Sequence, residues 1–162
     1  MYELLRQADL VEGMSSEQIR RLSLLGRART LPGGEYLFLL GDSAQHVCIV
    51  ASGQVDLCFP IRIGGVMTDI TVESVGSGKT VGWSALVKPY RFTLSARATE
   101  PTNLVAFSRQ DLLHLFDNDP GIGCVLLSRV SELVGNRLSS FQALWARELQ
   151  RRLETAVPPS AG

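Results

Sequence analysis

The segment Leu31–Leu57, with the sequence LPGGEYLFLLGDSAQHVCIVASGQVDL, contains the clearest indication of the fold. Its apolar runs EYLFLL, HVCIVAS and QVDL are short and rich in β-branched and aromatic residues, which are enriched in strands. The residues PGG, GDSAQ and SG separate these runs. Turn residues at such density are typical of hairpins in antiparallel sandwiches and barrels. The segment therefore predicts short strands joined by tight turns.

The same pattern continues as far as Phe107. The runs QVDLCFPIRI, VMTDITVESV, FTLSARAT and TNLVAF have strand composition, and the breaks GG and GSGK lie among them. Gly64-Gly65 is the clearest hairpin tip, because glycine adopts the positive φ angles that tight hairpins require. We therefore expect a mainly β fold in which residues 31–107 form an antiparallel β-barrel or jelly roll, also called a double-stranded β-helix.

A helical lead-in precedes the β region. Residues 1–30 contain SSEQIRRLSLLGRA, in which apolar residues recur at helical spacing. Ser15 or Ser16 can cap this helix, and Glu17 can complete a capping box.

Further helices follow the β region. The segment SRQDLLHLF begins at Ser108, and Asp119-Pro120 is a typical start for a long helix that we expect to continue to about Glu154. These boundaries predict one domain over residues 1–157, with helices at 108–157 and a disordered tail at 158–162.

The later half of the long helix carries an apolar stripe. Its members recur every three or four positions: Val134, Leu138, Phe141, Trp145, Leu149 and Leu153. This spacing places them on one side of a helix, where they need a partner surface. The partner is either the chain's own barrel or the same helix of a second chain. A helix of this length extends roughly 50 Å at about 1.5 Å per residue, more than a small barrel covers, so we expect a homodimer.

Charge and hydropathy exclude several classes of partner. The chain has 16 Lys and Arg and 16 Asp and Glu, so no overall positive field attracts nucleic acid and we expect no direct DNA binding. No apolar run approaches the roughly 20 residues that span a bilayer. The start MYELLRQADL lacks the features of a signal peptide. We therefore expect a cytoplasmic protein that does not enter membranes.

The sequence offers little for catalysis or metal binding. Cys48, Cys58 and Cys124 are widely spaced, and no CxxC or HxxxH pair is present, so we expect reduced thiols without a disulfide or a metal. GDSAQ lacks the second glycine of a nucleophile turn, and GSGKT lacks the upstream glycine of a phosphate-binding loop. We expect no enzymatic activity, no catalytic residue and no cofactor.

The order of these features resembles the cyclic nucleotide-binding domain, the family of catabolite-activator-type regulators and kinase regulatory subunits. The match rests on Leu31–Leu57 and on Val72–Val87, VESVGSGKTVGWSALV, and extends from Leu4 to about Leu144. The resemblance implies a stand-alone regulatory domain in signal transduction. Such a domain binds cyclic AMP, cyclic GMP or a related anion and acts through an effector protein that the sequence does not name.

The family's phosphate-binding cassette corresponds to residues 81–96, VGWSALVKPYRFTLSA. In the family, a turn at glycine followed by a one-turn helix directs backbone N–H groups at the cyclic phosphate. This sequence follows that pattern at Gly82, Ser84, Ala85 and Leu86. The family's glutamate, which accepts a hydrogen bond from the ribose 2′-hydroxyl, is replaced by Trp83, whose indole N–H only donates.

The family also places an arginine after the turn, where its guanidinium neutralises the phosphate. Counting back from Ala96 without gaps puts Tyr90 at that position and Arg91 one residue later, on the other face of a strand. A bulge or a different loop length would restore Arg91. Thr93 aligns with a Ser or Thr of the family. The implied ligand-binding residues are therefore Gly82, Trp83, Ser84, Ala85, Tyr90, Arg91 and Thr93.

Two functions remain open at this point. In the first, a cyclic nucleotide or another phosphate or carboxylate anion occupies the pocket and repositions the terminal helices. In the second, the indole of Trp83 fills the pocket, and the domain is a ligand-blind module for dimerisation and protein interaction.

Overall fold

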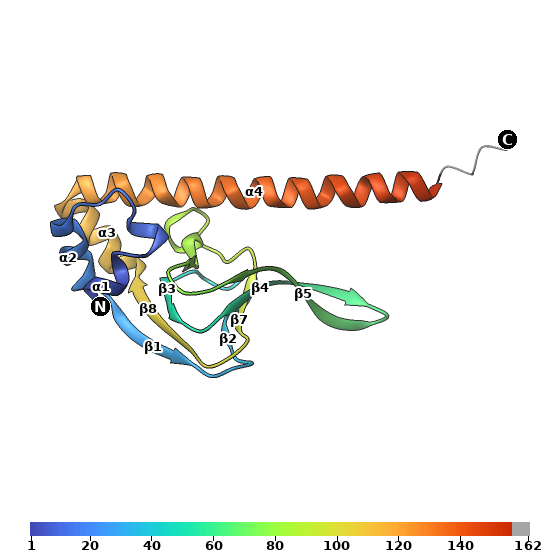
Figure 1. Ribbon diagram of the computed structural model, residues 1–162, viewed down its shortest axis with the longest axis horizontal. Coiled ribbons are helices and arrows are strands. Elements are labelled where there is room, and N and C mark those ends of the chain that lie inside the picture. The colour runs from blue at the N-terminus through green and yellow to red at the C-terminus, as the bar shows by residue number, and fades with distance from the viewer. Residues whose placement is uncertain (157–162) are drawn as a thin grey trace. The chain divides into compact units, whose positions relative to one another are not determined.

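The computed structural model describes residues 1–156 (Figure 1). The predicted tail at 158–162 and the predicted domain end at Val157 lie outside the described residues. The chain forms two compact units, of which the first is Met1–Arg129 and the second begins at Val130. The β region and the candidate site belong to the first unit.

Short helical segments lead into the β region. They are α1 (Tyr2–Leu5), the 3₁₀ turn η1 (Asp9–Val11) and α2 (Ser16–Ser23). Ser15 caps α2, because its Oγ accepts a hydrogen bond from the N–H of Gln18 at 3.2 Å and its own N–H donates to Gln18 Oε1 at 2.9 Å. The predicted cap at Ser15 is confirmed. The capping box is completed by Gln18 rather than by Glu17, since the third helical residue is the one that reaches back to the cap.

The strands in the described residues form two four-stranded sheets. The first sheet has the order β1 (Arg27–Leu31), β8 (Thr102–Ser108), β3 (His46–Ser52) and β6 (Thr80–Val81). The second has the order β2 (Tyr36–Phe38), β7 (Ser95–Ala98), β4 (Val55–Ile63) and β5 (Val66–Val75). All neighbours pair antiparallel. The predicted jelly roll with flanking helices is therefore confirmed.

The longest hairpin joins β4 to β5. Ile63 pairs with Val66 across a turn made by Gly64 and Gly65, whose φ angles are 56° and 88°. Both angles lie in the left-handed region, so the predicted hairpin tip is confirmed. This hairpin extends beyond the rest of both sheets (Figure 1).

The core between the sheets is built from small and aliphatic side chains. Its buried members are Leu31, Cys48, Val50, Val55, Leu57, Val75, Val81, Leu94, Ala96, Ala98, Leu104 and Ala106. The register of β1 against β8 places Arg29 opposite Leu104. Directly opposite residues share a face of the sheet. Strand β1 therefore carries Arg29 on the side of the sheet that faces the core, and the residue itself is exposed to solvent.

Two helices follow β8, namely α3 (Arg109–Asn118) and α4 (Pro120–Ala156). Asp119 caps α4 as predicted, because its Oδ1 accepts a hydrogen bond from the N–H of Ile122 at 3.2 Å and its carboxylate pairs with Arg21. In the second unit, α4 exposes the apolar residues Leu138, Phe141, Leu144, Trp145, Leu149 and Leu153. None of the helices within residues 1–156 has the length and hydropathy needed to cross a bilayer.

Candidate ligand-binding site

The predicted cassette turn is present in the structure. The one-turn 3₁₀ helix η2 (Trp83–Leu86) follows Gly82, whose backbone is left-handed with φ 78° and ψ 22°. A Cβ atom at position 82 would lie 2.8 Å from the carbonyl oxygen of His46. Both the backbone angle and the lack of space require glycine here. The backbone frame expected from the sequence is therefore kept.

Two stacked phenylalanine rings lie against this turn. The ring centroids of Phe38 and Phe92 are 3.6 Å apart, and the ring planes differ by 7°. The Cε1 atom of each ring is 3.4 Å from the position that a Cβ on Gly82 would take. The side chain of Phe92 is only 7% exposed. Aromatic side chains thus occupy the space beside Gly82, next to which the resemblance predicts a phosphate.

The side chain of Arg91 points elsewhere. It is exposed, and its Nη1 donates a hydrogen bond to the carbonyl oxygen of Gly41 at 2.8 Å. Burial alternates from Arg91 to Leu94, with Phe92 and Leu94 buried and with Arg91 and Thr93 exposed. The structure therefore packs Phe92 on Gly82 and does not bring Arg91 or Thr93 to the turn.

Tyr90 connects the cassette loop to α3. Its φ angle of 60° is left-handed, which is uncommon for a residue with a Cβ atom. Its N–H donates to the carbonyl oxygen of Val87, and its carbonyl oxygen accepts from the N–H of Ala44, both at 2.8 Å. The guanidinium of Arg109 lies 4.6 Å from the centroid of its ring, and Arg109 Nη1 donates to the carbonyl oxygen of Ala44 at 3.1 Å. Tyr90 is thus held against the first residue of α3.

The residues that follow Gly82 are buried. Trp83 is 9% exposed, Ser84 is 6% exposed and Ala85 is fully buried. Trp83 is therefore a buried residue, and its filling of the pocket, as in the ligand-blind alternative, stays a prediction. The roles of Gly82, Trp83, Ser84 and Ala85 toward a ligand stay predictions.

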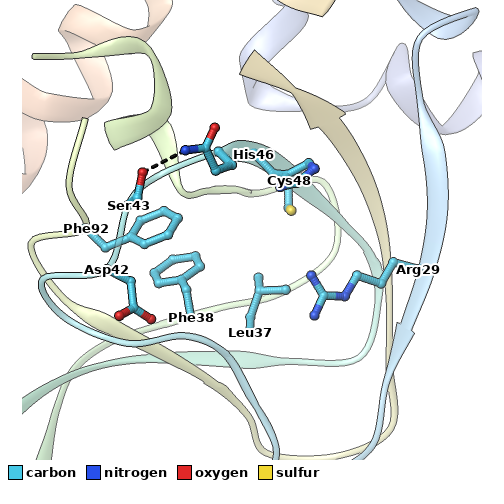
Figure 2. A pocket seen from close by; sticks show the side chains of 9 residues that line it. Arg29, Leu37, Phe38, Asp42, Ser43, His46, Cys48 and Phe92 are labelled. Atoms are coloured by element: carbon cyan, nitrogen blue, oxygen red, sulfur yellow. Dashed lines mark hydrogen bonds between the residues drawn. The ribbon is translucent and has the colours of Figure 1, made fainter. Parts of the chain in front are cut away.

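A cavity of about 260 Å³ lies beside the aromatic pair. Figure 2 shows Arg29 entering it from β1, with Leu37 between the guanidinium and the stacked rings. Asp42 and Ser43, from the loop between β2 and β3, line the opposite end beside Phe92 (Figure 2). The cavity therefore has a basic end, an aromatic wall and a polar end.

The polar groups around the cavity carry little competing charge near Arg29. Burial raises the pKa of the Cys48 thiol to about 12, against a smaller lowering by the positive charge of Arg29. The thiol is therefore neutral at physiological pH. The carboxylate of Asp42 accepts a hydrogen bond from the N–H of Leu39 at 3.2 Å, and it lies at the far end of the aromatic pair (Figure 2).

Three side chains that line this cavity were not predicted from the sequence, namely Phe38, Phe92 and Arg29. One signal for Phe92 was available, because counting back by twos from the apolar Ala96 and Leu94 leads to Phe92 rather than Arg91. For the other two no local signal exists, since their positions depend on pairing with distant strands.

A resident metal has no evident ligands in this part of the chain. Among residues 1–156, no group of His, Cys, Asp and Glu side chains is arranged to hold a metal ion.

Comparisons with known proteins show the family to which the chain is similar. A sequence model described as "Cyclic nucleotide-binding domain" matches residues 28–119. The cyclic AMP receptor protein of Thermus thermophilus is 29% identical over 150 residues, which make up 93% of this chain and 62% of that protein. The chain therefore spans less than two thirds of the length of this relative.

Similar proteins are also found among solved structures. The catabolite activator protein of Thermus thermophilus is similar with a TM-score of 0.69 and 27% identity, over 89% of this chain and 63% of that chain. The N-terminal domain of a transcriptional regulator from Streptomyces coelicolor A3(2) is similar with a TM-score of 0.68 and 25% identity, over 82% of this chain and 93% of that chain.

Proposed function

The chain belongs to the cyclic nucleotide-binding domain family, a family of non-catalytic regulatory domains, and from that premise we propose a regulatory domain whose cassette does not hold a cyclic nucleotide. The observation that carries the proposal is the stack of Phe38 and Phe92 against Gly82. The backbone turn of a phosphate site is kept, but two aromatic rings occupy the space beside the turn in which a guanidinium would neutralise the phosphate.

The physical chemistry of this arrangement disfavours a phosphate. An anion placed at Gly82 would lose its hydration and meet the hydrocarbon edges of two rings instead of a cation. Trp83 supplies no acceptor for a ribose hydroxyl. Moving Phe92 aside would expose a side chain that is now 7% exposed, which costs hydrophobic stabilisation. All three effects act against a cyclic nucleotide.

The output is proposed to use the second unit of the chain. On α4, Leu138, Phe141, Trp145 and Leu149 are 57, 37, 69 and 40% exposed. A second copy of the helix presents the same stripe, so a two-fold pair removes both stripes from water. We therefore propose a homodimer that signals to an effector protein. A cytoplasmic location is part of the proposal and is supported by free Cys48, Cys58 and Cys124.

Binding of cyclic AMP or cyclic GMP is the second candidate function. It is favoured by the left-handed Gly82 and the one-turn helix that follows it, and by the name of the Thermus relative. In that case Phe92 must leave the turn, and the ligand-binding residues are the predicted set, Gly82, Trp83, Ser84, Ala85, Tyr90, Arg91 and Thr93.

A titration of the full chain with cyclic AMP and cyclic GMP separates the two candidates. A bound ligand at about 100 times its dissociation constant stabilises the folded state by about 2.7 kcal/mol, which raises the melting temperature by about 5 to 10 °C for a chain of this size. We expect no such shift in the wild type. A saturable shift would refute the proposed function.

A pair of variants tests the role of Phe92. The double variant Trp83→Glu, Phe92→Arg restores the missing acceptor and the missing cation at the turn, so we expect it to bind cyclic AMP. The matched control is Trp83→Glu, Thr93→Arg, which adds the same charge at the exposed neighbouring position and is expected not to bind. Circular dichroism verifies that both variants fold.

A further inference from the structure

We propose that the cavity beside Phe38 and Phe92 binds a small organic carboxylate, with the guanidinium of Arg29 holding the carboxylate group. This inference rests on the proposed function, because it takes the domain to be a sensor. It adds the chemical class of the ligand that the sensor binds. The binding itself is tested separately from the cassette.

The placement of Arg29 supports an anion at one end of the cavity. Its register opposite Leu104 puts it on the face of the sheet that faces the core, and Figure 2 shows its guanidinium directed into the cavity. Among residues 1–156, its guanidinium makes neither a hydrogen bond nor an ion pair. By contrast, Arg91 donates to Gly41 and Arg109 donates to Ala44. An arginine without a partner beside a cavity is suited to a planar carboxylate.

The wall next to Arg29 defines the rest of the ligand. Leu37 lies between the guanidinium and the ring of Phe38 (Figure 2), so a ligand that reaches from one to the other has an apolar body behind its charged group. The cavity, at about 260 Å³, is smaller than the roughly 300 to 1,000 Å³ of pockets for drug-sized ligands. A single ring or a short chain is therefore the expected size.

The remaining polar groups favour one negative charge over two. The thiol of Cys48, buried beside Arg29, stays neutral and does not compete for the guanidinium. At the far end, the carboxylate of Asp42 would repel a second anionic group. These charges favour a monocarboxylate over a dicarboxylate or a nucleotide.

The aromatic wall connects this cavity to the cassette. Phe38 and Phe92 line the cavity and also pack on Gly82. A ligand that contacts these rings therefore contacts the pair that covers the cassette turn, and Tyr90 next to it is held by Arg109 at the start of α3. A ligand in the cavity would therefore touch Phe92, two residues after Tyr90, whose ring lies under the guanidinium of Arg109 at the start of α3.

The test is a titration of the isotope-labelled full chain, followed through backbone amide shifts by NMR. The probes are benzoate and hexanoate, and the neutral controls are benzyl alcohol and hexan-1-ol. We expect saturable shifts centred on Leu37, Cys48 and Phe92 with each carboxylate and much weaker effects with each alcohol. An absence of saturable shifts, shifts centred elsewhere, or equal affinity for acids and alcohols would overturn the proposal.

Two variants isolate the charge. Arg29→Gln should weaken benzoate binding by about tenfold or more, since hydrogen bonds to charged groups contribute more than neutral ones. Arg27→Gln is the matched control, because Arg27 is also exposed on β1 but does not line the cavity, and its affinity should stay at the wild-type value. Equal affinity in wild type and Arg29→Gln overturns the proposal. If Arg29→Gln does not fold, the comparison of acids with alcohols in the wild type still decides.

The two proposals fail in different experiments. A shift with cyclic AMP would refute the proposed function and leave carboxylate binding intact. An absence of carboxylate binding would refute this inference and leave the proposed function unaffected.

Discussion

The cassette turn and the cavity share the Phe38–Phe92 pair but differ in what each one lacks. The turn has the backbone geometry of a phosphate site and no cation beside it. The cavity has the guanidinium of Arg29 and no such turn. Gly82 is required by the carbonyl oxygen of His46, at 2.8 Å from a Cβ, whether or not a ligand binds. A glycine in the cassette is thus required by packing alone, whereas the charged side chain nearby decides whether an anion is held.

Removing the shared aromatic wall should have the largest effect. Phe92→Ala deletes a buried ring, and we expect a loss of about 3 to 5 kcal/mol of unfolding free energy, as for other buried phenylalanines. Urea denaturation measures the loss. Phe59→Ala is the control, because Phe59 is 44% exposed and should cost less than about 1 kcal/mol. Similar losses in the two variants would mean that the Phe92 ring is not packed against the turn at Gly82.

A smaller loss is expected from Gly82→Ala. The new Cβ would meet the carbonyl oxygen of His46 and force a residue other than glycine into a left-handed backbone, which together should cost about 2 to 4 kcal/mol. Gly34→Ala is the matched control, since Gly34 also has a positive φ of 87° but no atom within 4 Å of the added Cβ. It should show only the strain of about 1 kcal/mol. Equal costs at the two glycines would argue against the close contact with His46.

The smallest expected effect is on how the free energy of unfolding depends on pH, and it comes from the thiol of Cys48 in the cavity. The pKa of Cys48 is raised by burial from 9.0 to about 12, so the folded state favours the neutral thiol. The stability that this contributes is fully present below about pH 9 and is lost as the pH rises toward 12.

Urea midpoints between neutral and alkaline pH measure this contribution. Cys48→Ala should reduce the loss of stability at alkaline pH and leave the rest of the profile similar. Cys58→Ala is the control. Burial also raises the pKa of Cys58, though less, so this variant should change the loss of stability at alkaline pH less than Cys48→Ala does. A Cys48→Ala profile that matches the wild type would mean that the thiol beside Arg29 is not desolvated.

The sequence predicted the fold well, because the fold depends on local turns and alternation. Gly64 and Gly65 form the expected hairpin tip, Ser15 caps the first long helix, and Asp119 begins the last one. Each of these features is decided by a few neighbouring residues, so a single sequence is enough to locate it.

The candidate site was predicted only in its backbone. Counting forward through the cassette loop fails, since the loop ends at Tyr90 in a left-handed backbone conformation, whereas counting back by twos from Ala96 would have led to Phe92. Phe38 and Arg29 reach the site through pairing of β2 with β7 and of β1 with β8. Such contacts join residues that are far apart in the chain, and no local pattern encodes them.

The covering of the cassette turn by Phe38 and Phe92 is tested by observing the two rings themselves. NMR of the full chain with labelled phenylalanine rings and a labelled Gly82 amide, recorded without and with cyclic AMP at millimolar concentration, reports whether the rings leave the turn. We expect the contact between the Phe38 and Phe92 rings to persist and the chemical shift of the Gly82 amide to stay unchanged. Loss of that ring contact together with a saturable shift of the Gly82 amide would show that the cassette turn binds cyclic AMP and that the proposed function is wrong.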